Sequence, residues 1–511
     1  MSSHFILNPG HLTLGCLQQI IQENAHCVLA DSALPAIAAS AQTVQTIVAE
    51  KRTVYGINTG FGSLADQIIS PEHLCQLQRN IVLSHACGVG PLLSDAVVSL
   101  VLLLKVNNLA QGYSGIRLEI IEALLALFNH GVYPCIPAKG SVGASGDLAP
   151  LAHMALPLLG IGEVRFQGQI IPAVEGLAIA GLKPMTLQAK EGLALLNGLQ
   201  VSTAIALIAL FDAEKLFNTA LIAGALTVDA ASGSDVPFDE RIHKIRKHKT
   251  QQEVAAVYRN LLAGSEIRQS HINCSRVQDP YSLRCQPQIM GAILHQINFV
   301  RETLEVEANA VSDNPLVFSE TGDIVSGGNF HGEIIALAAD NLALAIAEIG
   351  AASERRIALL IDKYFSSLPG FLIRESGLNS GFMIPHVTAA ACASDNKALA
   401  HPHSVDSLPT SANQEDHVSM ATNAARRLEN MNDNTATILA IELLAASQGI
   451  DLRQPLKSSQ LLQKVHNQVR KDVPVYDEDR FFAPEIERIK KQVYHGVFAQ
   501  FIPQKWGMLD E

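Results

Sequence analysis

Apolar residues recur with helical spacing along most of this chain. Near the start, one set with this spacing indicates an amphipathic helix: Leu14, Leu17, Ile20 and Ile21. Residues 35–52 form an alanine-rich segment with proline at its beginning, where the first turn of a helix tolerates it. Residues 96–107 are strongly apolar throughout and predict a third, buried helix.

Longer helices are predicted in the second half. Within residues 286–311 the apolar positions with helical spacing are Ile289, Ile293, Ile297, Val300 and Leu304. Residues 332–362 are apolar on nearly every side, and at ~1.5 Å per residue such a helix runs on the order of 45 Å. Residues 415–448 are similar and are followed by Gly449, which we place at the C′ position. Helices this long and apolar need several neighbours, so we expect a central bundle to which several subunits contribute.

Strand-like alternation is clear only in residues 163–174, which predict a small hairpin. The fold class expected is therefore mainly all-α, with a mixed, loop-rich N-terminal part. We expect two domains, residues 1–200 and residues 201–511, the second holding the long-helix bundle and peripheral helices.

Composition narrows the class of protein. The chain has 511 residues, of which 48% are hydrophobic and 17% charged, and its net charge is −12. That charge argues against a nucleic-acid partner. The longest uninterrupted apolar runs fall short of the ~18 residues of a membrane span, and the N-terminus lacks a signal-peptide pattern. Eight cysteines without C-x-x-C pairs indicate reduced thiols, so we expect a cytoplasmic protein.

The most unusual segment is residues 139–157, KGSVGASGDLAPLAHMALP. Its centre, Ala144-Ser145-Gly146, has little side-chain bulk and lets the backbone turn tightly. Asp147 is a good helix N-cap, and Pro150 suits the first turn that follows. A phosphate cradle is disfavoured because no lysine and hydroxyl pair follows the glycines. A hydrolase nucleophile elbow is disfavoured because Asp147 replaces its last glycine.

Two interpretations of this segment remain open on the residues alone. One is an ordinary glycine-rich turn. The other is backbone chemistry, in which the Gly146 nitrogen adds to the Ala144 carbonyl and closes a five-membered ring. Loss of water from that ring and from the Ser145 side chain would leave a conjugated electrophile.

Other polar segments interrupt the helices. Tyr55 lies in a loop with three glycines, which is either a mobile surface loop or a lid carrying an acid or base. Residues 277–288, 326–333 and 413–417 each precede a predicted helix, where the dipole favours anions and where simple capping is the alternative. For metal binding we considered His401, His403 and His417, which lack a zinc-ligand spacing; we therefore expect no metal.

Eight segments in order resemble the aromatic amino-acid ammonia-lyase and aminomutase family. They are YGINTGFG, SHACGVG, GSVGASGDLAPLAH, KEGLALLNG, VQDPYSLRCQPQ, SDNPLVF, SGGNFHGE and TSANQEDHVSM, and the resemblance covers most of the chain, from Tyr55 to beyond Arg427. The resemblance implies that Ala144, Ser145 and Gly146 cyclise autocatalytically into 4-methylideneimidazol-5-one (MIO), with no external cofactor. It also implies a homotetramer whose active sites combine loops from different subunits.

The same resemblance implies roles for nine further residues. Tyr55 is expected to be the base that removes the β-proton, and Tyr281 a second tyrosine beside the prosthetic group. Arg284 is expected to bind the substrate carboxylate, a task that suits its bidentate fork. The remaining residues are expected to line the substrate or the prosthetic group: Asn197, Gln278, Phe330, His85, Gln414 and Glu415.

His85 and Glu415 bear on the substrate. An imidazole offers a donor and an acceptor, which a histidine and a carboxylate complement. A phenylalanine or tyrosine side chain would leave a buried Glu415 poorly satisfied, which is costly. The expected activity is therefore elimination of ammonia from L-histidine to give trans-urocanate, the first step of histidine degradation. The alternatives are a tyrosine or phenylalanine ammonia-lyase, an aminomutase, an argininosuccinate-lyase-like enzyme, or an inactive helical scaffold.

Overall fold

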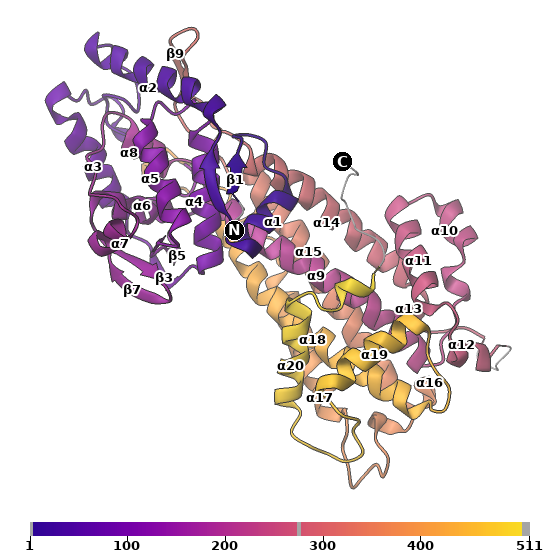
Figure 1. Ribbon diagram of the computed structural model, residues 1–511. Coiled ribbons are helices and arrows are strands. Elements are labelled where there is room, and N and C mark those ends of the chain that lie inside the picture. The colour runs from indigo at the N-terminus through magenta and orange to yellow at the C-terminus, as the bar shows by residue number, and fades with distance from the viewer. Residues whose placement is uncertain (1–3, 273–276, 503–511) are drawn as a thin grey trace. The chain divides into compact units, whose positions relative to one another are not determined.

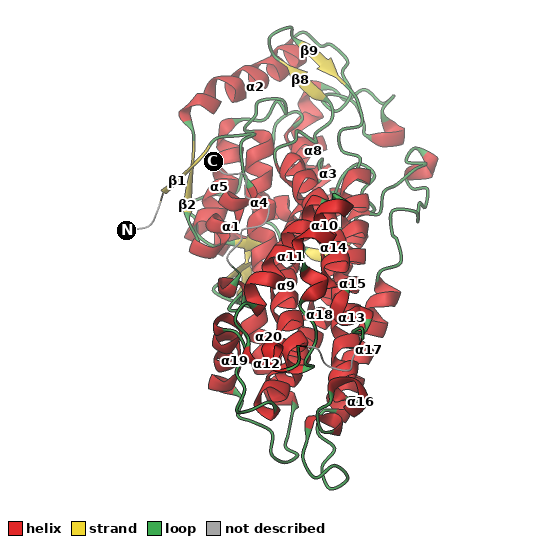
Figure 2. Cartoon of the chain, turned by 90° about the vertical axis from the view of Figure 1, so that its right-hand side faces the viewer, coloured by secondary structure: helices red, strands yellow, loops and turns green. Residues whose placement is uncertain are grey.

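The computed structural model of the chain describes residues 4–272 and 277–502. Helices dominate these residues and the strands are short, as Figure 2 shows. The predicted all-α class is thus confirmed. The chain forms two compact units, each assembled from three segments. Unit 1 combines the described parts of Met1–Ile208, Arg301–Asp340 and Pro402–Arg426; unit 2 combines those of Ala209–Val300, Asn341–His401 and Arg427–Glu511. A single domain boundary at residue 200 stays a prediction.

Unit 1 holds the shorter helices of the first third of the chain (Figure 1). They are α1 (Leu14–Glu23), α2 (Leu34–Ala49), α3 (Leu74–His85), α4 (Asp95–Leu109), α5 (Leu118–Asn129), α6 (Leu148–Ala155), α7 (Ala173–Ile179) and α8 (Glu191–Leu196). The first, second and third predicted helices correspond to α1, α2 and α4. Helix α4 is buried on all sides because α5 and other elements of the unit pack around it.

All strands of the described residues lie in unit 1, in four small sheets. β1 (His4–Leu7) pairs parallel with β2 (His26–Leu29), and β3 (Val89–Leu92) pairs antiparallel with β5 (Pro137–Lys139). The predicted hairpin is β6 (Glu163–Phe166) with β7 (Gln169–Pro172), and β4 (Tyr133–Pro134) extends it. β8 (Leu316–Phe318) and β9 (Asp323–Val325) form the last sheet.

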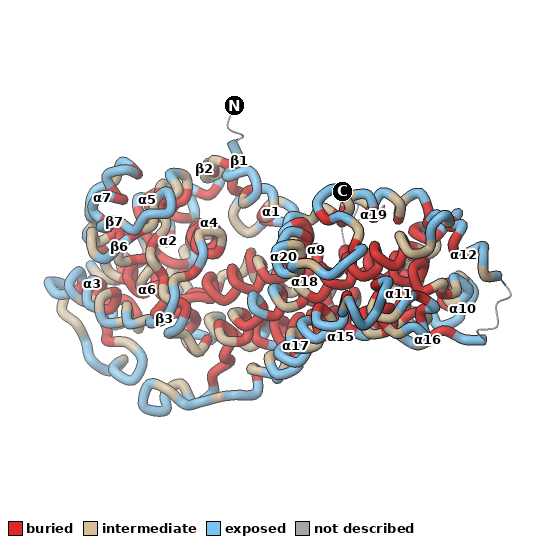
Figure 3. Tube along the Cα trace, turned by 90° about the horizontal axis from the view of Figure 1, so that it is seen from below, coloured by how far each residue is buried: buried red, intermediate tan, exposed pale blue. Residues whose placement is uncertain are grey.

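Four long helices begin or end in unit 1 and run on in unit 2. They are α9 (Gln200–Ala230), α14 (Gln286–Ala308), α15 (Glu333–Ile361) and α18 (Ala421–Leu452). Within unit 2 they form a bundle whose interior is buried (Figure 3). A fully buried Glu442 on α18 accepts hydrogen bonds from Thr227 on α9 and Ser353 on α15 and pairs with Arg356, also on α15. Gln286 on α14 donates to the carbonyl of Gly224 on α9.

The remaining helices of unit 2 surround this bundle. They are α10 (Glu240–Arg246), α11 (Lys249–Leu262), α12 (Glu266–Ser270), α13 (Tyr281–Arg284), α16 (Lys363–Ser366), α17 (Met383–Leu399), α19 (Gln460–Asp472) and α20 (Ala483–Tyr494). By length and composition alone, α15 and α18 contain windows apolar enough to cross a membrane, contrary to what uninterrupted runs indicated. Of those windows 61% and 83% is buried inside the protein, which is typical of core helices.

The last long helix differs from its prediction at both ends. It begins at Ala421, six residues later than expected, and ends at Leu452. Gly449 is therefore inside the helix and is not its C′ residue. A Cβ there would lie 2.8 Å from Cβ of Ala230 on α9, so this glycine allows the two helices to approach closely.

Candidate active site

The Ala-Ser-Gly loop (residues 140–147) connects β5 to α6 and is folded against the segment after α8. Gly146 pairs with Gly198, and the Asp147 amide donates to the Gly198 carbonyl at 2.7 Å. Gly146 has φ +77°, and a Cβ on it would lie 2.3 Å from that carbonyl oxygen. Only glycine fits here, both by conformation and by space.

Ser145 is held from both of its polar ends. Its hydroxyl donates to Oε1 of Glu415 at 2.5 Å, and its carbonyl accepts a hydrogen bond from Nδ2 of Asn197 at 3.0 Å. Asn197 is buried, and its Oδ1 accepts no hydrogen bond from the described residues. An unpaired buried acceptor costs free energy, so this oxygen is available to a donor of a bound ligand. The structure thus brings Ser145, Asn197 and Glu415 together as the sequence predicted.

The side chain of Asp147 fixes the Ala-Ser-Gly loop to neighbouring helices. Its carboxylate is fully buried and accepts hydrogen bonds from Ser141, Thr422 and both the amide and hydroxyl of Ser202. Asp147 does stand at the N-cap of α6, but its side chain makes no capping bond there. The predicted capping role is therefore wrong, since the carboxylate instead ties the loop to the first turn of α9 and to α18.

Glu415 lies in a strained turn that precedes α18. Ser411, Ala412 and Asn413 all have positive φ, between 51° and 68°, a conformation that costs non-glycine residues about 1–2 kcal/mol each. Thr410 closes the turn, since its hydroxyl donates to Oε2 of Glu415 at 2.5 Å and its amide to the Glu415 carbonyl. The prediction of a helix start at residues 413–417 is wrong because this left-handed turn ends before the helix begins.

The charges of the site follow from its contacts. Burial opposes ionisation of Glu415, but hydrogen bonds from Ser145, Thr410 and Ser411 outweigh it and lower the pKa of the carboxyl. His85, the last residue of α3, has its pKa lowered by burial, partly offset by the backbone of Ile81 and the charge of Glu415. At neutral pH the site therefore presents a carboxylate and a neutral imidazole.

Tyr55 and Phe330 lie on the loops that flank this centre. The Tyr55 hydroxyl accepts a hydrogen bond from the Gly62 amide at 3.3 Å. The turn at residues 62–64 packs against residues 411–413, which brings the Tyr55 loop beside the Glu415 turn. Phe330 is half-buried, and Gly332 two residues later donates to the Gly143 carbonyl at 3.1 Å.

Four further predicted site residues are more exposed or belong to unit 2. Gln414 is exposed beside Glu415 in unit 1. The other three belong to unit 2: Gln278, Tyr281 and Arg284. Tyr281 is 70% exposed, and the Arg284 guanidinium lies 4.7 Å from the centre of the Tyr281 ring. Nε of Arg284 donates to the Asp279 carbonyl at 3.0 Å. The roles of these three residues around Ser145 stay predictions.

Lys105 is a further residue of this region that the sequence motifs did not predict. This lysine is fully buried in α4, and its ammonium donates to the Asn197 carbonyl at 2.6 Å and lies 3.5 Å from Oε1 of Gln200. Burial lowers its pKa to about 7, against an opposing attraction from Asp313. The available signal was a single lysine in a largely apolar predicted helix, because burying a charge without a partner costs free energy.

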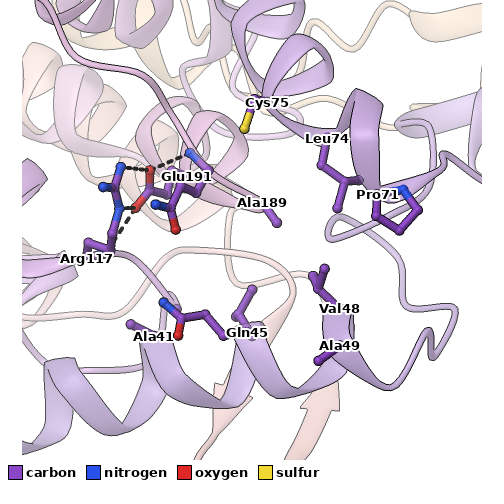
Figure 4. A pocket seen from close by; sticks show the side chains of 13 residues that line it. Ala41, Gln45, Val48, Ala49, Pro71, Leu74, Cys75, Arg117, Ala189 and Glu191 are labelled. Carbon is purple, nitrogen blue, oxygen red and sulfur yellow. Dashed lines mark hydrogen bonds and ion pairs between the residues drawn. The ribbon is translucent and has the colours of Figure 1, made fainter.

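A cavity of about 360 Å³ in unit 1 does not include any of these residues (Figure 4). It is lined mainly by apolar side chains of α2 and α3 and by Arg117 and Glu191. The guanidinium of Arg117 makes two hydrogen bonds to the Glu191 carboxylate, at 2.7 and 2.8 Å, and a third to the Thr186 carbonyl. Because this cation is already neutralised, the cavity offers no site for the carboxylate of an amino acid.

Comparison with known proteins identifies the family of the chain. Residues 12–471 match the model of the family described as aromatic amino acid lyase. The chain is 72% identical over 499 residues to a histidine ammonia-lyase of Legionella pneumophila, covering 98% of this chain and 99% of that protein. It is 61% identical over 503 residues to one of Vibrio cholerae, covering 98% of each.

Solved structures show the same fold. The crystal structure of histidine ammonia-lyase from Trypanosoma cruzi superposes with a TM-score of 0.91 at 42% identity, covering 98% of this chain and 95% of that one. Tyrosine aminomutase from Streptomyces globisporus superposes with a TM-score of 0.92 at 32% identity, covering 98% and 99%. On this agreement of sequence and fold, the chain is a lyase and belongs to the aromatic amino acid lyase family.

Proposed function

We propose that this protein eliminates ammonia from L-histidine to give trans-urocanate, the first step of histidine degradation, in the cytoplasm. The observation that carries the proposal is the contact between the Ser145 hydroxyl and the Glu415 carboxylate, with the charge of Glu415 acting on His85. The names of the relatives at 72% and 61% identity support the choice of substrate.

The Ala-Ser-Gly loop suits conversion to MIO. The backbone at Gly146 is left-handed and pressed against Gly198, so the chain is already tightly turned where a five-membered ring would close. Asn197 donates to the Ser145 carbonyl, the oxygen that such a ring would retain. Bound in this way, MIO supplies an electrophilic methylidene carbon, the former Cβ of Ser145.

Each remaining residue has a task that its chemistry fits. Tyr55 removes the β-proton of the substrate as general base, from a loop that lies beside the Glu415 turn. Asn197, which donates to the Ser145 carbonyl, would withdraw electron density from a ring formed there. Phe330 packs beside the prosthetic group and excludes water. Arg284 binds the substrate carboxylate with its planar fork, while Gln278 and Tyr281 orient the amino group.

Specificity for histidine follows from the charges of the site. Glu415 is ionised and accepts a hydrogen bond from the N–H of a substrate imidazole, and neutral His85 can donate to or accept from its second nitrogen. Gln414, exposed beside Glu415, is assigned to the same end of the substrate. A phenyl ring would leave the half-buried Glu415 carboxylate without this partner. The apolar long helices are consistent with a homotetramer in which residues of unit 2 from one subunit complete the site of another.

The proposal is tested by two measurements on the purified full chain. The first incubates it separately with L-histidine, L-tyrosine and L-phenylalanine and follows the near-ultraviolet absorbance of each product. We expect urocanate from histidine and at most trace activity with the other two. Activity on tyrosine with none on histidine would instead favour a tyrosine-specific enzyme such as the aminomutase whose structure this chain resembles.

The second measurement addresses the prosthetic group by itself. Mass spectrometry of the peptide containing residues 140–150 is expected to show the loss of two waters. An unmodified Ser145 peptide from an active preparation would refute the MIO assignment, whatever the substrate.

A further inference from the structure

Three side chains with metal-binding atoms meet in unit 1 beside the candidate site. One ligand atom each from His331, Glu333 and His417 lies within 4.8 Å of the other two. Nε2 of His417 is 3.8 Å from Oε2 of Glu333, and the two imidazole rings are stacked with centroids 5.7 Å apart. Sequence analysis considered His417 only with His401 and His403, because His331 and Glu333 are more than 80 positions away from it.

One carboxylate oxygen of Glu333 is an unpaired hydrogen-bond acceptor among the described residues. Its Oε2 is shielded from solvent yet accepts no hydrogen bond from the described residues. A shielded carboxylate oxygen without a donor is costly, and the usual partners are a cation or a metal ion.

We propose that His331, Glu333 and His417 bind a divalent transition-metal cation of the Zn²⁺ or Co²⁺ class. Two imidazoles and one carboxylate form a ligand set that suits these borderline metals, whereas Mg²⁺ and Ca²⁺ prefer oxygen ligands throughout. Metal–ligand distances of ~2.0–2.2 Å require the three atoms to close by about 1 Å. The side chain of His417 is 67% exposed and is free to make this adjustment.

The position of the cluster gives the metal a structural consequence. Gly332, between two of the ligands, donates to the Gly143 carbonyl at 3.1 Å. Ser419, two residues after His417, donates to the same carbonyl at 2.9 Å. The metal would therefore join the two segments that already hold the Ala-Ser-Gly loop, those carrying Phe330 and Glu415.

Cobalt is the probe of choice, because its visible absorption reports the ligands. Metal-stripped full-length protein is titrated with Co²⁺, followed by absorbance and calorimetry, in the absence of amino acids. We expect one Co²⁺ per chain and the visible bands of a low-coordinate N₂O site. Because no turnover is measured, this result does not depend on the proposed function.

Single substitutions locate the metal. We expect His417→Ala, His331→Ala and Glu333→Gln each to weaken Co²⁺ binding by more than roughly 100-fold. His130→Ala, which removes an exposed imidazole elsewhere in unit 1, is the matched control and should bind like the native chain. Thermal unfolding of each metal-free variant checks the fold, and His417→Ala is the safest because its side chain is the most exposed of the three.

Two outcomes would overturn the proposal. One is the absence of stoichiometric Co²⁺ binding by the native chain, which would make the cluster a stacked histidine pair beside a glutamate. The other is binding that survives all three substitutions, which would place the metal elsewhere.

Discussion

Two glutamates in this protein accept several hydrogen bonds and yet do opposite things. Glu442 in unit 2 is fully buried and receives Thr227, Ser353 and a bidentate Arg356, so both its charge and its oxygens are satisfied. Glu415 in unit 1 is half-buried and follows a left-handed turn. Among the described residues, the side chains that donate hydrogen bonds to its carboxylate do so through hydroxyl groups. Unlike Glu442, the Glu415 carboxylate receives no arginine from the described part of the chain, so its negative charge can still interact with a ligand. Complete pairing is typical of a structural group, whereas a carboxylate beside a strained turn is the basis for proposing a functional role for Glu415.

The most severe test of this contrast removes the hydroxyl that Glu415 holds. Ser145→Ala cannot form the methylidene group, so we expect activity on L-histidine to fall by at least about 10⁴-fold, or about 5 kcal/mol of activation free energy. Thermal unfolding should be nearly unchanged, because the uncyclised loop of the variant keeps the contacts of Asp147 with Ser202 and Thr422. Substantial retained activity would refute the role of Ser145.

The buried pair in unit 2 should respond in the reverse sense. Glu442→Gln leaves the Arg356 guanidinium buried without a carboxylate, which costs about 3 kcal/mol or more in the free energy of unfolding. Chemical denaturation measures this loss. The matched control is Glu415→Gln, for which we expect a change within about 1 kcal/mol but a large loss of activity. Equal destabilisation by both would remove the contrast.

Lys105 is buried like Glu442, but among the described residues no carboxylate lies within ion-pair distance of its ammonium. Its pKa is about 7 in the folded state and near ~10.4 in an unfolded chain. Between these values the unfolded state binds more protons, so this lysine makes stability rise with pH by at most about 1.4 kcal/mol per unit. Lys105→Met should therefore flatten the dependence of the unfolding free energy between pH 7 and 9.

The control for that measurement is Lys249→Met, which alters a lysine whose side chain is 91% exposed. Its pH dependence should follow that of the native chain. A Lys105→Met profile that also follows the native chain would mean that the ammonium is solvated in solution.

The smallest expected effect concerns the strained turn itself. Ala412 has φ +55°, so Ala412→Gly relieves a steric cost while adding freedom to the unfolded chain. We expect the unfolding free energy to change by less than about 1 kcal/mol. A drop in kcat without a change in stability would show that the stiffness of this turn serves Glu415. Unchanged kinetics would show that the bonds from Thr410 suffice.

Local patterns predicted most of the helices, because a helix that is buried on one face carries apolar residues at helical spacing, and this spacing can be recognised in the sequence. The hairpin at residues 163–172 was found in the same way, from alternation. The start of α18 was not, because the left-handed residues 411–413 carry no side-chain pattern that distinguishes them from a helix start. Gly449 was misplaced for a similar reason, since its role depends on Ala230 on another helix.

The site shows the same limit. Motifs and family resemblance named Ser145, Asn197 and Glu415, and the structure groups them. They could not show that Asp147 anchors the loop to two helices, because its partners Ser202 and Thr422 are distant in sequence. Lys105 can be recognised in the sequence as an isolated lysine in an apolar run. Its role was missed because its acceptor, the Asn197 carbonyl, is distant in sequence.

The assembly of unit 1 from three segments has a consequence for synthesis of the chain. Ser145 and Glu415 are 270 positions apart. At typical ribosomal rates of ~5–20 residues per second, roughly 15 to 50 s pass between their emergence. During that interval the nascent Ala-Ser-Gly loop has neither Glu415 nor the Thr422 hydroxyl that holds Asp147. A ribosome that stalls before residue 410 therefore releases a chain that contains the reactive sequence without the contacts that shape it.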